Sequence, residues 1–94
     1  MIGLLLAGLA IAFVAAALLT YATLKKWFRN NTIVDKDNVR AILQEAMENG
    51  EYRVVQCGFN RKNKEITAVK GYRAKRRDEE LIKKGPEAII HEEC

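Results

Sequence analysis

Residues 2–24 read IGLLLAGLAIAFVAAALLTYATL, and this stretch decides the fold that the sequence predicts. It carries no charged residue. As an α-helix rising about 1.5 Å per residue it would be about 34 Å long, enough to cross a hydrocarbon core about 30 Å thick. Because lipid offers the backbone no hydrogen-bond partner, a single segment that crosses it must be helical. We therefore predict one transmembrane helix over residues 1–24.

The residues that follow this stretch favour the same interpretation. A basic juxtamembrane segment and linker over residues 25–34 would place cations at the lipid headgroups and an indole ring at the membrane interface. The predicted membrane-interface anchor consists of Lys25, Lys26, Trp27 and Arg29. Since no basic residue precedes the apolar run, a retained anchor is favoured over a cleaved signal peptide. The charge asymmetry predicts an N-terminus outside the cell and a cytoplasmic C-terminal domain.

Small residues recur at every fourth position within the stretch. On a helix this spacing places them on one face, and small side chains let two membrane helices approach closely. Because glycine and alanine are common in membrane spans, such a stripe can also arise by chance. The predicted helix-packing face consists of Gly8, Ala12, Ala16 and Thr20.

Residues 35–94 are predicted to form one small cytoplasmic α+β domain. Its first element would be a helix over residues 36–49, with an aspartate as N-cap and Gly50 just past its end. The apolar residues of this segment follow the spacing of an amphipathic helix; they are Val39, Ile42, Leu43, Ala46 and Met47.

The next segment predicts a β-hairpin. Residues 51–59 and 65–72 are rich in β-branched and aromatic side chains, and the polar residues 60–64 between them suit a turn. Gly58 and Gly71 are expected to mark bulges or close backbone approaches. Because an isolated hairpin is marginally stable in water, we expect the preceding helix to cover it.

The C-terminal part predicts a short helix and an optional strand. Residues 73–84 are highly charged, and their helix would begin either near Ala74 or at Asp78 and end before Pro86. Residues 87–94 would add a short third strand or stay irregular. The predicted fold class is thus a single transmembrane α-helix followed by a small α+β domain of helix, hairpin, short helix and possible third strand.

The residues suited to chemistry are few. Cys57, His91 and Cys94 offer at most three soft ligands, whereas zinc sites usually show paired close spacings. A buried strand thiol is favoured over a nucleophile for Cys57, because His91 is the sole imidazole base in the sequence. Cys94 is expected to be a free surface thiol. We therefore predict no enzyme, no cofactor and no metal site.

A second basic cluster lies beside an aromatic residue. The possible anion-binding patch consists of Tyr72, Arg73, Lys75, Arg76 and Arg77. Such a patch suits the phosphates of lipid headgroups or nucleic acid. Three acidic residues follow it at once, and the sequence holds 12 acidic residues beside 16 basic ones. A mixed, solvated surface is therefore favoured over nucleic-acid binding.

These features predict a non-catalytic single-pass membrane protein. It would act as a small accessory, assembly or structural subunit of a larger membrane complex or of a membrane-associated virion. Its partners would be the lipid bilayer and other membrane-protein subunits or a second copy of itself, with no small-molecule substrate. The alternative is a membrane-tethered binding module that recruits anionic lipid or nucleic acid. The subunit is favoured because a domain of about 70 residues gains little stability from its own core.

Overall fold

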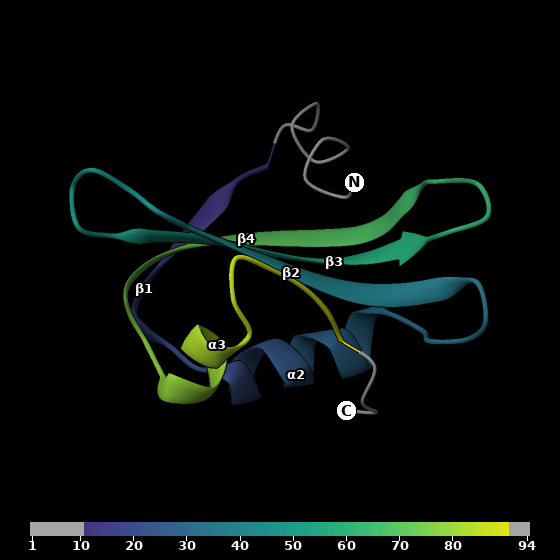
Figure 1. Ribbon diagram of the computed structural model, residues 1–94, viewed down its shortest axis with the longest axis horizontal. Coiled ribbons are helices and arrows are strands. Elements are labelled where there is room, and N and C mark those ends of the chain that lie inside the picture. Colours follow the sequence, from purple (N-terminus) through teal and green to yellow (C-terminus); the bar gives the residue numbers. More distant parts are fainter. Residues whose placement is uncertain (1–10, 91–94) are drawn as a thin grey trace.

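The computed structural model describes residues 11–90, which form a five-stranded sheet and two short helices (Figure 1). In chain order the elements are β1 (Phe13–Leu19), α2 (Tyr21–Asn31), β2 (Asn38–Ala46), β3 (Tyr52–Asn60), β4 (Ile66–Arg77), α3 (Glu79–Lys83) and β5 (Glu87–Ile90). The strands lie in the order β1-β4-β3-β2-β5. β1 runs parallel to β4, and all other neighbours are antiparallel. Both helices lie on one side of the sheet (Figure 1).

The predicted transmembrane helix is wrong. Its second half forms strand β1, the extended residue Thr20 and the beginning of α2. Neither helix within residues 11–90 is both long and apolar enough to cross a membrane. The single-pass membrane assignment, with an outer N-terminus and a cytoplasmic domain, is therefore not supported. The first ten residues of the predicted span lie outside the described residues.

Thr20 divides the apolar stretch into a strand and a helix. Its backbone is extended, and its hydroxyl accepts a hydrogen bond from the Thr23 amide at 3.2 Å, which makes it the N-cap of α2. Asp78 holds the same corner, because its amide donates to the Leu19 carbonyl at 3.0 Å and its carboxylate accepts from the Tyr21 amide at 3.1 Å. A short apolar run is compatible with a strand as well as a helix, and pairing with β4 decides the outcome here.

α2 is an amphipathic helix that packs on the sheet. Tyr21, Leu24 and Phe28 lie at helical spacing and are buried. Thr32 ends the helix, because its backbone is extended and both its amide and its hydroxyl donate to the Phe28 carbonyl, at 2.9 and 2.6 Å. The helix that covers the sheet is therefore α2, in place of the helix predicted over residues 36–49, and it begins inside the predicted transmembrane span.

The helix predicted over residues 36–49 is also wrong, because β2 occupies this segment. Its buried side chains alternate between the two faces of the sheet, and the strand has neighbours on both sides. A strand buried on both faces is apolar at many positions, so its residues can imitate helical spacing. Gly50, predicted to end the helix, has φ +85° and lies in the loop between β2 and β3.

The predicted hairpin is confirmed, and its second strand extends to Arg77. The pairing of β3 with β4 shifts register between Gly58 and Phe59. A Cβ atom on Gly58 would lie 2.7 Å from the Thr67 hydroxyl, and one on Gly71 would lie 2.7 Å from the Phe13 ring. Both glycines therefore mark the bulge and the close approach expected of them.

The C-terminal elements follow the later of the two predicted helix starts. α3 begins at Glu79, and Asp78 is its N-cap because the carboxylate accepts a hydrogen bond from the Leu81 amide at 3.0 Å. The optional strand is present as β5, which pairs antiparallel with β2.

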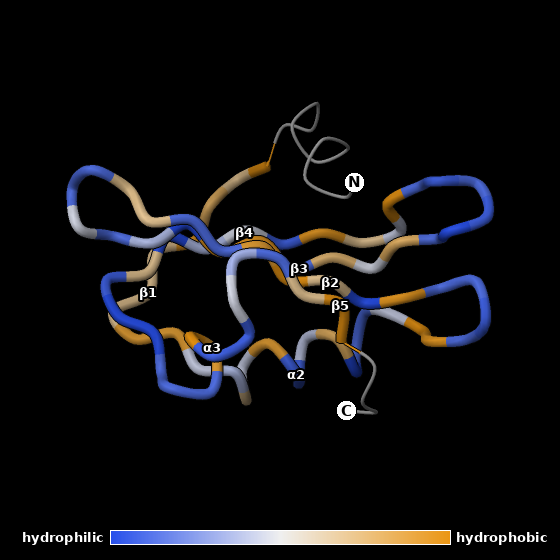
Figure 2. Tube along the Cα trace, in the orientation of Figure 1, coloured by the Kyte–Doolittle hydropathy of each residue, from blue (hydrophilic) through white to orange (hydrophobic). Residues whose placement is uncertain are grey.

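The sheet separates two apolar clusters. The helix-side cluster lies between the sheet and the helices and includes Leu19, Tyr21, Leu24, Phe28, Ile42, Val54, Tyr72, Ala74, Leu81 and Ile90. The opposite-face cluster comprises Val39, Ala41, Val55, Cys57 and Phe59. The loops between β2 and β3 and between β3 and β4 are hydrophilic (Figure 2). Strand β1 therefore lies at one edge of a sheet with apolar side chains on both faces.

Candidate interaction surface

Strand β1 presents a free backbone edge. Within residues 11–90 it pairs with β4 alone, so the N–H and C=O groups along its other side have no strand partner there. In other proteins, charged residues and prolines on an edge strand discourage pairing with another chain. The sequence of β1, FVAAALL, contains neither. Two apolar side chains on this strand are half-exposed, Val14 at 51% and Leu18 at 48%. β1 thus offers an apolar edge seven residues long.

The opposite edge of the sheet differs. β5 has only four residues and begins with the exposed acidic residue Glu87. Short edge strands and charged edge residues both limit pairing with another chain. The free edge suited to binding is therefore that of β1.

Val14 and Leu18 were not among the residues predicted from the sequence. Once the stretch is interpreted as a membrane helix, an edge strand within it cannot be recognised. The available signal is Thr20, since a threonine that caps a helix implies a different structure on its N-terminal side.

Basic residues lie on the strands next to this edge. Arg73 on β4 lies directly opposite Arg53 on β3, and the Arg53 guanidinium is 5.0 Å from the centroid of the Phe13 ring. The Phe13 ring covers Gly71 on one face of the sheet. Because side chains alternate along a strand, Arg73 and Lys75 point to that same face. Arg53, Arg73 and Lys75 form what we term the basic surface, on the face opposite the helices.

Two acidic residues only partly balance the basic surface. Arg53 lies 3.8 Å from Glu45, and Arg73 lies 3.8 Å from Glu51. The two arginine side chains are 46% and 53% exposed, so each ion pair contributes at most about 1 kcal/mol.

The predicted anion-binding patch is divided by the strand. Tyr72 is buried, its hydroxyl donates to Gln56 Oε1 at 2.5 Å, and burial raises its pKa. Arg77 stacks 3.8 Å from the centroid of the Tyr52 ring and donates through Nη1 to Gln44 Oε1 at 2.8 Å. The side chains of Tyr72 and Arg77 therefore connect β4 to residues of β3 and β2. The exposed members of the patch are Arg73, Lys75 and Arg76.

The residues predicted as a helix-packing face occupy different settings. Gly8 lies outside the described residues, and Ala12 precedes β1. Ala16 lies within β1 and packs against the helix-side cluster, while Thr20 caps α2. Among the described three, the four-residue spacing therefore corresponds to no helix face.

The residues predicted as a membrane-interface anchor all lie on α2. Trp27 packs partly buried against the helix-side cluster, with its ring edge-on to Phe28 at a centroid distance of 5.7 Å. Lys26 and Arg29 are exposed, and Lys25 is half-buried. The indole of Trp27 thus contributes to packing, whereas Lys26 and Arg29 lie on the solvent-exposed side of α2.

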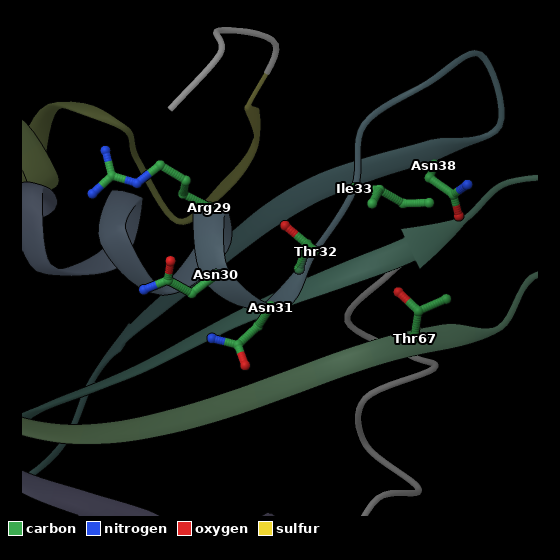
Figure 3. Close-up of a pocket in the computed structure, with 7 residues that line it drawn as sticks. All are labelled: Arg29, Asn30, Asn31, Thr32, Ile33, Asn38 and Thr67. Carbon is green, nitrogen blue, oxygen red and sulfur yellow. The ribbon is translucent and has the colours of Figure 1, made fainter.

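An open cleft of about 370 Å³ lies at the C-terminal end of α2 (Figure 3). Its lining residues are Arg29, Asn30, Asn31, Thr32, Ile33, Asn38 and Thr67. Figure 3 shows them spread over the end of the helix, the following loop and two strands, with Arg29 far from Asn38 and Thr67.

Three of the polar side chains that line this cleft have protein partners. The Asn31 side chain donates to the main chain of α2 at 2.8 Å, and the Thr32 hydroxyl accepts from Arg40 Nε at 2.7 Å. The Asn38 amide donates to the carboxylate of Asp35 at 3.0 Å. A ligand site needs convergent polar groups, and Arg29 lies far from Asn38 and Thr67 across this open cleft (Figure 3).

Cys57 has the environment of a structural thiol. Its side chain is fully buried, and this burial raises its pKa to about 12. Because the thiolate is the reactive form, such a cysteine is a poor nucleophile. Within residues 11–90 no three His, Cys, Asp or Glu side chains gather as a metal site would require. His91 and Cys94, the other residues considered as ligands, lie outside the described residues.

Comparisons with known protein families, with curated proteins and with solved structures find no match to this chain.

Proposed function

We propose that this protein is a non-catalytic subunit that assembles with protein chains by strand pairing at the free edge of β1. The observation that carries the proposal is the edge itself: seven residues without charge or proline, with Val14 and Leu18 half-exposed beside backbone groups that have no strand partner among residues 11–90.

Strand addition supplies both affinity and selectivity from such an edge. The main chain of an incoming strand forms the next ladder of hydrogen bonds, and alternate side chains contact those of the host strand. Ala16 and Leu19 are three residues apart, yet both pack against the helix-side cluster, so the alternation of side chains is broken between Val14 and Leu18. A partner's strand would therefore contact Val14 and Leu18 on different faces of the sheet.

The test compares two leucine-sized apolar residues of equal exposure. Leu18 is 48% exposed on β1, and Ile82 is 49% exposed on α3. The full chain carrying Leu18→Lys, and a matched chain carrying Ile82→Lys, are each expressed in the cells that normally produce the protein. Extracts are then fractionated by size under native conditions.

We expect the unmodified chain and the Ile82→Lys variant to elute within a larger assembly. The Leu18→Lys variant should elute as the free chain, because a lysine at the edge interferes with strand pairing. Equal elution of the two variants, or an unmodified chain that elutes free, would contradict the proposal.

A second candidate function is polyanion binding at the basic surface. The observation that favours it is the direct opposition of Arg53 and Arg73, since like charges at opposing strand positions are destabilising unless something neutralises them. Lys75 extends the same face. A phosphate backbone laid along this face would add negative charge to that of Glu45 and Glu51, whose ion pairs with the two arginines are weak.

The probe for this second function is a fluorescent single-stranded oligonucleotide. The affinity should fall steeply as salt is added, because phosphate contacts release counterions. The double variant Arg73→Thr, Lys75→Thr should bind at least ~10-fold more weakly at low salt, as expected for two lost phosphate contacts. The control, Arg61→Thr with Lys62→Thr, removes the same charges from the exposed β3–β4 loop. Equal losses in both variants would exclude a defined site.

A further inference from the structure

We propose that the face of the sheet opposite the helices is the docking site of residues 1–10 of the same chain. These residues lie outside those that the structure describes, and they precede Ile11 and strand β1 in the chain. This docking does not depend on the strand pairing proposed at β1, because it uses a face of the sheet and not its edge.

The centre of this face is closed to solvent, although neither helix lies on it. Both helices lie on the other side of the sheet (Figure 1). Ala41 on β2 is paired with Cys57 on β3, and both residues are 0% exposed. Apart from Ile11, the residues of 11–90 that pack in this cluster all belong to strands. Strands of one sheet lie side by side and leave the face above them open, so the cover must come from outside residues 11–90.

Exposure increases from the centre of this face to its margin. Around the fully buried pair, Val39, Val55 and Phe59 are 5%, 8% and 7% exposed. The apolar side chains beyond them on β2, β4 and β5 are only partly buried; they are Leu43, Ile66, Val69 and Ile89. A short segment that crosses the middle of the sheet accounts for this pattern, whereas a second domain would bury the margin as well.

The chain is already on this face where the described residues begin. Ile11 and Phe13 both pack against the opposite-face cluster. A Cβ atom on Gly71 would lie 2.8 Å from Ile11 Cγ2 and 2.7 Å from the Phe13 ring, so both side chains lie over β4. Residue 10 is therefore joined to a residue that contacts the proposed docking site.

Length and composition both suit residues 1–10 to this face. Their sequence, MIGLLLAGLA, has no charged or polar side chain. Ten residues extend to at most ~33 Å, and β4 and β5 are separated by three strand spacings, about 14 Å. The segment can thus cross the whole face from β4, and removal of both apolar surfaces from water drives the contact.

The segment at the other end of the chain does not suit this face. Residues 91–94 read HEEC and carry two carboxylates among four residues. Burial of an unpaired carboxylate against apolar side chains is strongly unfavourable. The apolar cover is therefore assigned to residues 1–10.

The thiol of Cys57 reports whether the face is covered. In a full chain with Cys94→Ser, Cys57 is the single cysteine, and its alkylation by iodoacetamide is followed under native conditions. The test variant replaces Leu4, Leu5 and Leu6 with Asp, and the matched control replaces the same three residues with Ile. Alkylation should become at least ~10-fold faster in the aspartate variant, because carboxylates resist burial, and should not change in the isoleucine variant.

The fluorescence of Trp27 separates loss of the cover from global unfolding. Its ring packs against the helix-side cluster, so its emission should stay native in the aspartate variant. Faster alkylation with native emission would support the proposal, and unchanged alkylation would overturn it.

A cross-linking measurement on the folded chain decides the case if the aspartate variant unfolds. A diazirine analogue of leucine is placed at position 5 of the full chain, and the links formed on irradiation are located by mass spectrometry. We expect intramolecular links to the opposite face, at residues such as Val69 and Ile89. Links to α2 or α3, or the absence of links, would contradict the docking. Links formed only between two molecules would assign the cover to a second copy and also overturn it.

Discussion

The two faces of the sheet are buried by different kinds of contact. Under the helices, three buried polar side chains donate hydrogen bonds to helix carbonyls. Arg40 reaches the Phe28 carbonyl at 3.3 Å, Gln44 the Leu81 carbonyl at 2.7 Å, and Gln56 the Leu24 carbonyl at 3.0 Å. On the opposite face the buried residues are Val39, Ala41, Val55, Cys57 and Phe59, none with a charged or amide side chain.

This difference indicates how the helices are positioned. Apolar contacts are not directional, so they favour burial without selecting one placement of a helix. A buried amide or guanidinium must meet its acceptors at the correct distance, because leaving it unpaired costs about 1–3 kcal/mol. Arg40 and Gln44 donate to carbonyls near the C-terminal ends of α2 and α3, in addition to the amides of Thr32 and Lys84 that cap these carbonyls. The polar contacts therefore fix where each helix ends on the sheet.

The largest expected effect is on the helix-covered face. Gln44→Ala removes the amide that donates to the Leu81 and Gly85 carbonyls and the oxygen that accepts from Arg77. Leaving these groups without their partners should lower the free energy of unfolding by about 3 kcal/mol. Urea unfolding monitored by Trp27 fluorescence measures the change.

The neighbouring residue provides the control for this substitution. Glu45 lies next to Gln44, and its side chain is 70% exposed with an ion pair of 3.8 Å to Arg53. Glu45→Ala should therefore change the stability by less than about 0.5 kcal/mol. A similar small effect for Gln44→Ala would show that hydrogen bonding does not position α3.

The parts of the fold that follow from the sequence are those with local signals. The hairpin of β3 and β4 is recognisable from its two β-rich runs, its polar turn and the crowded glycines Gly58 and Gly71. The start of α3 follows from Asp78, whose carboxylate caps the helix. In each case neighbouring residues supply the decisive interaction.

The incorrectly predicted elements depend on distant partners. Pairing with β4, more than 50 residues away in the chain, makes Phe13–Leu19 a strand, and nothing within that run indicates it. β2 is likewise buried on both faces of the sheet, so its apolar residues carry no period of two. The candidate edge could not be predicted for the same reason, since an edge exists only once the order of the strands is known.

The next effect concerns the opposite face and depends on pH. Burial raises the pKa of Cys57 to about 12 from 9.0, so the folded protein retains this proton while the unfolded chain releases it above pH 9. The unfolded state then binds fewer protons, and stability falls as the pH rises from 9 towards 12. At pH 10 the loss due to this thiol should be about 1.4 kcal/mol.

The Cys57→Ala variant isolates this loss. Burial also raises the pKa of Tyr72, which contributes alkaline destabilisation of the same sign in both proteins. The difference in unfolding free energy between the unmodified chain and Cys57→Ala should therefore shift by about 1.4 kcal/mol between pH 7 and pH 10, against the unmodified chain. Parallel pH profiles would indicate that the thiol is accessible to solvent.

The smallest expected effect concerns the basic surface, which belongs to the opposite face but is exposed. Arg73→Thr removes a charge that directly opposes Arg53, together with a 3.8 Å ion pair to Glu51. Because the like-charge contact is unfavourable and the exposed ion pair is weak, stability should rise by about 0.3 kcal/mol at low salt. The gain should disappear at high salt, since screening removes the repulsion. Lys62→Thr, in the β3–β4 loop, should leave stability unchanged at both salt concentrations.

A stabilising Arg73→Thr would mean that folding does not require this arginine, which supports its use in binding an anion. A loss of stability would instead assign Arg73 to the packing of the sheet.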